Sequence, residues 1–129
     1  MTVFFKWLDD YSLGITKIDQ QHQYMFQLAN EIQYSSPSEF KQYAEKLYQY
    51  TKYHFGDEER YYTEINSPLL KEHLGLHNQL LKKLVSIIDE GLSTHEKFEK
   101  LKYFYLNWLI DHILYQDRRV VRDINPKIS

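Results

Sequence analysis

The 129-residue sequence lacks cysteine, and that absence excludes disulfide bonds, thiolate metal sites and cysteine nucleophiles together. Only three prolines and four glycines are present, so few positions would interrupt regular secondary structure. No uncharged run approaches the ~20 apolar residues that span a bilayer. The opening segment meets acidic residues too early for the apolar stretch of a signal peptide. We therefore expect a cytoplasmic protein that does not insert into a membrane.

A large net charge is also missing, because 16 basic residues oppose 18 acidic ones and leave a formal net charge of −2. The overall charge therefore favours no nucleic-acid partner. Hydrophobic residues make up 43% of the chain, and 129 residues are enough for one core and too few for two. The sequence predicts a single domain over residues 1–129, and we expect a monomer whose protein partner, if it has one, the sequence does not identify.

Apolar residues recur at three- and four-residue steps over four segments, which is the spacing of one face of a helix. After an N-terminal arm, the predicted helices cover residues 18–35, 38–65, 69–90 and 94–116. Ser93 and Glu96 have capping-box spacing at the start of the last helix, and Gly91 suits the end of the third. The connections are short enough to make neighbouring helices antiparallel. We therefore expect an all-α, up-down-up-down four-helix bundle.

Polar residues interrupt the apolar stripe of every predicted helix. They are His22 on the first helix, His54 and Glu58 on the second, His73 and His77 on the third, and His112 on the fourth. Burying polar groups without partners is costly, so one such residue is unremarkable but five of the six histidines require a common cause. A shared partner at the centre of the bundle is the economical explanation. Elsewhere the inward stripes are expected to continue through Tyr61 and Tyr115.

The spacing of these residues favours a bound ion. His54 and Glu58, like His73 and His77, are four positions apart and project from one face of a helix. Asp117 follows His112 by five positions, which points it away in a regular helix. If Asp117 is also a ligand, the helix must end or bulge between the two residues, and the segment "LYQDRRVVRD" resembles a fraying terminus.

Five imidazoles and two carboxylates are too many ligands for one metal, but they fit two metals bridged by both carboxylates. Because five imidazoles cannot divide evenly, one metal is filled by three, and the other holds two and keeps an open position. Mixed imidazole and carboxylate ligands at high coordination favour iron over zinc, which prefers four ligands.

The chain resembles the hemerythrins, specifically the single-domain bacteriohemerythrins, in the motifs "GITKIDQQH", "HFGDEE", "HLGLH" and "WLIDHILYQD" and in the N-terminal Trp7. The resemblance implies a hemerythrin-like bundle with two non-heme iron ions, oxo- or hydroxo-bridged, that binds O2 reversibly for storage, delivery or buffering rather than acting as an enzyme. By resemblance, the filled iron takes His73, His77 and His112, the open iron takes His22 and His54, and the bridges are Glu58 and Asp117. The implied O2 pocket comprises Met25, Phe55, Trp108, Leu109 and Ile113.

Other functions remain open at this stage: an oxygen or redox sensor acting through a partner protein, a diiron enzyme acting on peroxide or nitric oxide, a diiron oxidase, and a bundle that holds zinc or another structural metal. Asp117 also has an alternative role without a metal, a surface ion pair with Arg118 or Arg119. We expect His95 to be exposed and uninvolved. Four positions depart from the family pattern, and they are Met25, Tyr62, Ser67 and Leu80.

Gly75 poses a smaller question, because it lies inside a strong helix between two candidate ligands, where glycine costs about 1 kcal/mol against alanine. It falls off the inward stripe. Either a close contact with a neighbour requires it or the helix merely tolerates it.

Overall fold

The computed structural model describes residues 6–33, 35–36, 38–89 and 93–124, with the backbone alone for residues 33, 94, 106, 123 and 124. The described residues form helices and no strand. After a short 3-10 helix, η1 (Asp9–Tyr11), the elements are α1 (Thr16–Gln33), α2 (Phe40–Glu64), α3 (Leu70–Asp89), α4 (Thr94–Asp111), η2 (His112–Asp117) and α5 (Arg118–Ile124). The helix end expected at Gly91 lies outside the described residues.

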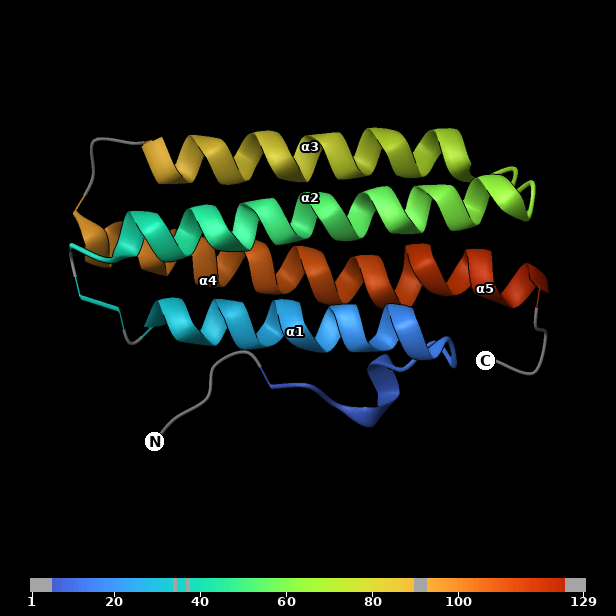
Figure 1. Ribbon diagram of the computed structural model, residues 1–129, viewed down its shortest axis with the longest axis horizontal. Coiled ribbons are helices and arrows are strands. Elements are labelled where there is room, and N and C mark those ends of the chain that lie inside the picture. The colour runs from blue at the N-terminus through green and yellow to red at the C-terminus, as the bar shows by residue number, and fades with distance from the viewer. Residues whose placement is uncertain (1–5, 34, 37, 90–92, 125–129) are drawn as a thin grey trace.

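The four long helices run in alternating directions and lie side by side along the length of the molecule (Figure 1). Contacts join α1 to α2, α2 to α3, α3 to α4 and α4 back to α1, which closes the bundle. The predicted all-α, up-down-up-down bundle is confirmed. Among the described helices, none combines the length and the apolar composition that a membrane crossing needs.

The first three helices begin and end within two residues of their predicted bounds, and the fourth helix begins at the predicted residue. Ser93 is the N-cap of α4, and its hydroxyl accepts a hydrogen bond from the backbone N–H of Glu96 at 3.2 Å. Asn66, just after α2, has a φ of 55°, a left-handed conformation that asparagine tolerates better than most residues. The turn "NSP" at residues 66–68 therefore ends α2 within one residue of the predicted end at residue 65.

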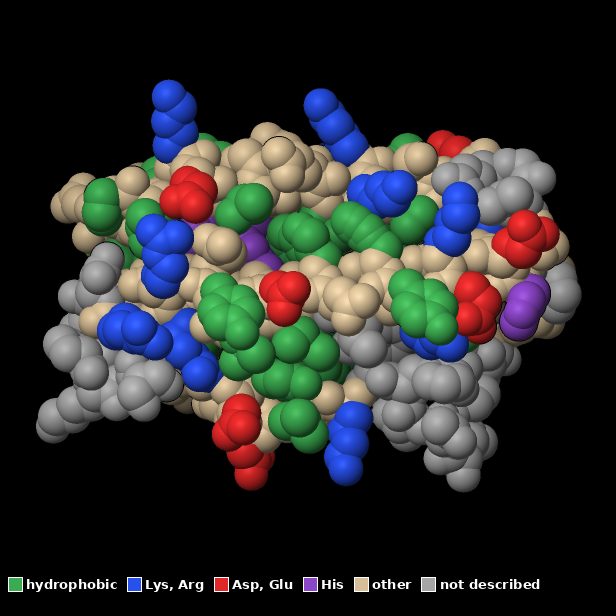
Figure 2. All heavy atoms as spheres, turned by 180° about the vertical axis from the view of Figure 1, so that it is seen from behind, with side chains coloured by type: hydrophobic (Ala, Val, Ile, Leu, Met, Phe, Trp, Pro, Cys, Tyr) green, Lys and Arg blue, Asp and Glu red, His purple; other side chains and the backbone are tan. Residues whose placement is uncertain are grey.

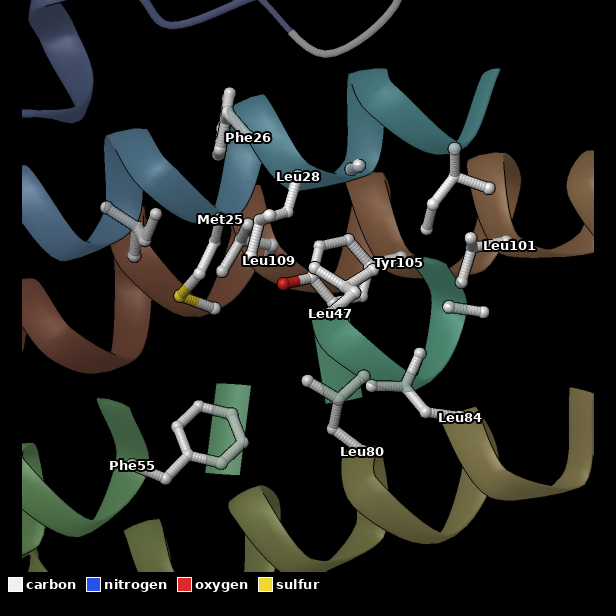
Figure 3. Close-up of a cluster of buried hydrophobic side chains, with 14 of the residues drawn as sticks. Met25, Phe26, Leu28, Leu47, Phe55, Leu80, Leu84, Leu101, Tyr105 and Leu109 are labelled. Carbon is white, nitrogen blue, oxygen red and sulfur yellow. The ribbon is translucent and has the colours of Figure 1, made fainter. Parts of the chain in front are cut away.

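The apolar stripes meet in one core between the helices. Figure 3 shows its larger side chains, with Leu47 from α2, Leu84 from α3, and Leu101 and Tyr105 from α4 converging on the bundle interior. Because the helices alternate in direction, the start of α1 and α3 and the later parts of α2 and α4 share one half of the bundle. The interrupting histidines fall in that half.

The fourth helix differs from the prediction. Instead of ending near residue 116, the rod passes through η2, which is a π-helix, and continues as α5 to Ile124 (Figure 1). The prediction that Tyr115 points inward is wrong, because its side chain is 63% exposed and Asp117 is buried instead. The wider π turn adds one residue to the turn and so shifts which positions face the core. On α2, Tyr62 rather than Tyr61 is fully buried.

The N-terminal arm packs against α1 through aromatic rings. Trp7 and Tyr11 both contact Phe26, with ring centroids 5.5 and 5.7 Å apart. The arm then turns at Gly14, whose φ of 76° suits glycine. Asp19 in α1 accepts a hydrogen bond from the backbone N–H of Leu13 at 2.8 Å. The arm is thereby fixed to the half of the bundle that holds the histidines.

Candidate metal centre

Seven polar side chains from four helical segments converge in the interior, each at most 4% exposed. They are His22 from α1, His54 and Glu58 from α2, His73 and His77 from α3, and His112 and Asp117 from η2. These are the seven residues that the sequence singled out as candidate ligands. The structure brings all of them together.

One side of the cluster holds three imidazoles, and we call it the three-imidazole side. The Nε2 atoms of His73 and His112 lie 3.0 and 3.2 Å from Oδ1 of Asp117. Nε2 of His77 lies 3.1 Å from Oε1 of Glu58 and 3.1 Å from Nε2 of His112. Each carboxylate therefore directs one oxygen to this side.

The other side holds two imidazoles, and we call it the two-imidazole side. Nε2 of His54 lies 2.9 Å from Oε2 of Glu58. Nε2 of His22 lies 3.6 Å from both Oε2 of Glu58 and Oδ2 of Asp117. Both carboxylates thus span the two sides, with three imidazoles at one pair of oxygens and two at the other.

Hydrogen bonds from outside the cluster fix the tautomer of His54. Asp57 accepts from the side-chain amide of Gln21 at 2.8 Å, which leaves the amide oxygen facing Nδ1 of His54 at 2.7 Å. Because that oxygen can only accept, Nδ1 of His54 carries the proton. Nε2 then presents its lone pair to the centre of the cluster. Lys17, 3.4 Å from Asp57, anchors the chain of contacts at the surface.

A second contact of this kind orients His77. Its Nδ1 lies 2.8 Å from Oε2 of Glu59, a carboxylate that can only accept, so Nδ1 carries the proton. Phe55 stacks on the ring of His77 at 3.7 Å between centroids and 1° between planes. Partners of this kind hold metal-binding imidazoles in the required tautomer and orientation.

Three buried atoms that face the cluster centre have no hydrogen-bond partner: Nε2 of His54, Oε2 of Glu58 and Oδ2 of Asp117. Buried polar atoms are rarely left in this state because the loss of hydration is costly. All three can donate a lone pair to a bound ion. A cation accepts lone pairs from every direction at once, so the residues present fit a bound metal.

The protonation of the metal-free cluster supports the same conclusion. Burial disfavours charge on every member, but the neighbouring histidines outweigh burial and hold the pKa of Glu58 well below its usual value. The pKa of Asp117 is also lowered, since His112 and His73 outweigh burial and the nearby Glu58. Burial alone would lower the pKa of His112, but the negative charges and hydrogen bonds of Asp117 and Glu58 outweigh burial and raise this pKa to about 10. Without metal, protons must supply the positive charge that the two carboxylates need, and metal binding releases them.

The π-helix explains how Asp117 joins the cluster. In a regular helix Asp117 would point well away from His112, whereas in η2 their facing atoms lie 3.2 Å apart. The bulge expected if Asp117 is a ligand is therefore present. The alternative, a surface ion pair, is wrong because Asp117 is fully buried. Arg118 instead contacts the backbone oxygen of Asp10, and Arg119 lies 3.7 Å from Glu72.

An apolar wall adjoins the cluster. Met25, Phe55, Leu109 and Ile113 are buried in the core, and Trp108 is partly buried against it. Figure 3 shows Met25 from α1, Phe55 from α2 and Leu109 from α4 directed into the interior. Trp108 also stacks on His112, with centroids 4.4 Å apart. These five residues are the ones that the resemblance assigned to a ligand pocket.

A surface recess of about 400 Å³ leads toward this wall and is lined by Leu76, Trp108, Asp111, His112, Tyr115 and Gln116. Figure 2 shows one face of the molecule on which histidine atoms are visible between hydrophobic side chains, with basic and acidic side chains around them. The edge of the cluster therefore approaches solvent beside Trp108.

Sequence reasoning missed three residues that contact the cluster: Gln21, Glu59 and Tyr62. Gln21 and Glu59 each adjoin a candidate ligand in sequence, and Tyr62 follows Glu58 by one helical turn. The hydroxyl of Tyr62 donates to Oδ1 of Asp117 at 3.0 Å. Burial raises the pKa of Tyr62 well above its usual value, and the negative charges of Asp117 and Glu58 raise it further. The phenol therefore stays protonated. The helical spacing was the available signal for Tyr62.

Two other expectations have clear outcomes. His95 is exposed at the start of α4, as expected. A Cβ added at Gly75 would meet nothing within 4 Å, so no close contact requires glycine there. Nothing in the structure explains this glycine.

A closed bundle of antiparallel helices around five imidazoles and two carboxylates, with lone pairs aimed at a common centre, defines a helical metal-binding protein. A sequence model of the hemerythrin HHE cation binding domain matches residues 13–123. The chain belongs to the hemerythrin family, as its motifs indicated.

Relatives of this family cover the chain almost end to end. A bacteriohemerythrin from Clostridium acetobutylicum is 32% identical over 129 aligned residues, which span 91% of this chain and 98% of the relative. A bacteriohemerythrin from Stenotrophomonas maltophilia is 25% identical over 95% of this chain and 83% of its own length. One from Campylobacter jejuni is 23% identical, with 92% and 93% covered.

Proposed function

We propose that this protein binds O2 reversibly at two non-heme iron ions bridged by Glu58 and Asp117, for oxygen storage, delivery or buffering. The observation that carries the proposal is that three imidazoles lie on one side of the two carboxylates and two on the other. His73 and His77 belong to the three-imidazole side, and His54 to the two-imidazole side. Membership of the hemerythrin family supports iron as the metal. When bound, the iron pair supplies the two electrons that reversible O2 binding uses.

In this proposal the two sides have different tasks. His73, His77 and His112 fill the coordination of one iron and hold it in place. His22 and His54 would hold the other iron and would leave it a position for O2. Gln21 keeps the ring of His54 in its orientation through a 2.7 Å contact, so Nε2 of His54 stays directed at the centre of the cluster.

The apolar wall protects this chemistry. Met25, Phe55 and Ile113 are almost fully buried and bring no side-chain oxygen or nitrogen to the cluster. An apolar lining excludes water and limits proton supply, which slows the escape of reduced oxygen species. Loss of such species would leave the iron oxidised and inactive, so the wall favours reversible binding.

The balance of neutral and anionic ligands points the same way. Five imidazoles accompany two carboxylates here, whereas the ferritin-like diiron sites combine four glutamates with two histidines. Fewer anionic ligands stabilise high-valent iron less. We expect this set to favour reversible binding over oxidation of substrates.

An optical experiment tests the proposal. Metal-free protein is loaded with ferrous iron under argon, desalted and analysed, and its visible spectrum is followed through cycles of air and argon. We expect two irons per chain and an absorption band that appears in air and disappears under argon over repeated cycles. A zinc-loaded sample is the colourless control. Continuous O2 consumption with an added reductant, or turnover of peroxide or nitric oxide, would instead show an enzyme.

A further inference from the structure

Tyr62 stands beside the cluster without belonging to the ligand set. It lies on α2 one turn after Glu58, and its side chain is fully buried. Its ring meets the ring of His73 edge-on, with centroids 4.9 Å apart. Its hydroxyl lies 3.0 Å from Oδ1 of Asp117. One side chain therefore touches both an imidazole and a bridging carboxylate on the three-imidazole side.

The direction of the hydrogen bond follows from chemistry. An ionised carboxylate only accepts, so the phenol of Tyr62 is the donor to Asp117. A hydrogen bond to a charged group is about twice as strong as one between neutral groups. The bond both restrains the carboxylate and draws negative charge toward the phenolic proton.

The hydrogen bond from Tyr62 reaches only one of the two carboxylate oxygens of Asp117. Oδ1 of Asp117 takes the phenol and also faces Nε2 of His73 and of His112, at 3.0 and 3.2 Å. Oδ2 faces His22 and has no hydrogen-bond partner. The two oxygens of this carboxylate are therefore unequal, and the weaker electron donor is the one on the three-imidazole side.

We propose that Tyr62 is a positioning residue that holds Asp117 and weakens its electron donation to iron on the three-imidazole side, which raises the reduction potential there. The inference rests on the proposed function only in taking iron as the metal. Weaker electron donation by the carboxylate destabilises ferric iron more than ferrous iron, because ferric iron carries the larger charge. The centre therefore remains longer in the reduced state that reversible O2 binding requires.

Tyr62→Phe removes the hydroxyl and keeps the ring. Tyr105→Phe is the matched control, because Tyr105 is also fully buried and its hydroxyl pairs with Thr51 at 3.1 Å, outside the cluster. Both proteins are loaded with ferrous iron under argon and equilibrated with a redox mediator at fixed potential. The measured quantity is the ratio of reduced to oxidised iron, read from the visible spectrum together with iron per chain.

We expect Tyr62→Phe to keep two irons and to lower the ratio of reduced to oxidised iron by about three- to tenfold. A change of this size corresponds to part of the free energy of a hydrogen bond to a charged group. We expect Tyr105→Phe to leave the ratio unchanged. Introducing 3-fluorotyrosine at position 62 makes the phenol a stronger donor, so we expect the ratio to rise, and this protein decides the matter if Tyr62→Phe does not fold. An unchanged ratio in the variant that folds and binds iron overturns the proposal.

The experiment separates this inference from the proposed function. If the ratio shifts as expected but the parent protein shows no reversible cycle between air and argon, the function is wrong and the role of Tyr62 stands. If the parent protein cycles and the ratio does not move, the function stands and the role of Tyr62 is wrong.

Discussion

Nε2 of His112 lies 3.2 Å from Oδ1 of Asp117, although the two residues are five positions apart on one helical rod. A regular helix places neighbours of one face three or four positions apart. The π-helix His112–Asp117 adds one residue to the turn and lets both side chains enter the same cluster. The centre therefore depends on a local departure from regular helix geometry.

Deleting Tyr115 tests this dependence. Tyr115 is exposed within the π-helix, and its removal leaves Asp117 four positions after His112, a spacing that a regular helix presents on one face. We expect the deletion to preserve the fold, the downstream register and most of the bound iron. Deleting Tyr103, which is equally exposed in the regular part of α4, should rotate every later residue by about 100° and abolish iron binding. Equal iron content in the two deletions would contradict the account.

Replacing one imidazole should remove iron selectively. His77→Ala leaves Oε1 of Glu58 and Oε2 of Glu59 without the ring they contact at 3.1 and 2.8 Å. We expect iron per chain to fall from two to one or fewer after anaerobic loading and desalting. His95→Ala is the control, because His95 is exposed and should leave the iron content unchanged. The assignment fails if both variants lose iron to the same extent.

The sequence predicted the bundle because each stripe is long and strongly periodic, and short turns fix the direction of each helix. It also predicted which polar residues would meet, since His22, His54, His73 and His112 occupy inward positions on those stripes. Periodicity alone decides such placements when the helix is regular.

The same reasoning failed where the helix is irregular or the partner is remote. The stripe of the fourth helix placed Tyr115 inward, but the π turn shifted the register and placed Asp117 there instead. Gln21 and Tyr62 contact cluster members on other helices, 33 and 55 positions away. Such contacts depend on side-chain rotamers within the packed bundle, which sequence spacing does not specify.

Gly75→Ala should stabilise the protein. The site is exposed within α3, and an added Cβ meets nothing within 4 Å, so only the helix preference changes. We expect a gain of about 0.5–1 kcal/mol in the free energy of unfolding. Denaturant unfolding of the iron-loaded protein measures it, and iron per chain should not change. A loss of stability would indicate that Gly75 has a role that its open surroundings do not reveal.

The metal-free protein should lose stability as the pH rises above neutrality. The pKa of His112 is about 10 in the folded chain against an ordinary 6.5, so its contribution is complete below about 6.5 and lost as the pH rises through 10. The lowered pKa values of Glu58 and Asp117 act oppositely, since their contributions are lost as the pH falls through the acidic range. We therefore expect the greatest stability near mildly acidic pH.

Thermal unfolding between pH 6.5 and 10 in the presence of a chelator measures this effect. The decline should be shallower in His112→Gln, which lacks the titrating ring, and shallower in the iron-loaded protein, where metal replaces the protons. A metal-free protein whose melting temperature is constant or rises over this range would contradict the assigned charges.

The most direct test of the central claim is diffraction from crystals of the iron-loaded protein, measured at the iron absorption edge. We predict two anomalous peaks per chain within the cluster, both in contact with Glu58 and Asp117. One should be bound by His73, His77 and His112 and the other by His22 and His54. A single peak, peaks outside the cluster, or two irons with the imidazoles divided in another way would contradict the account.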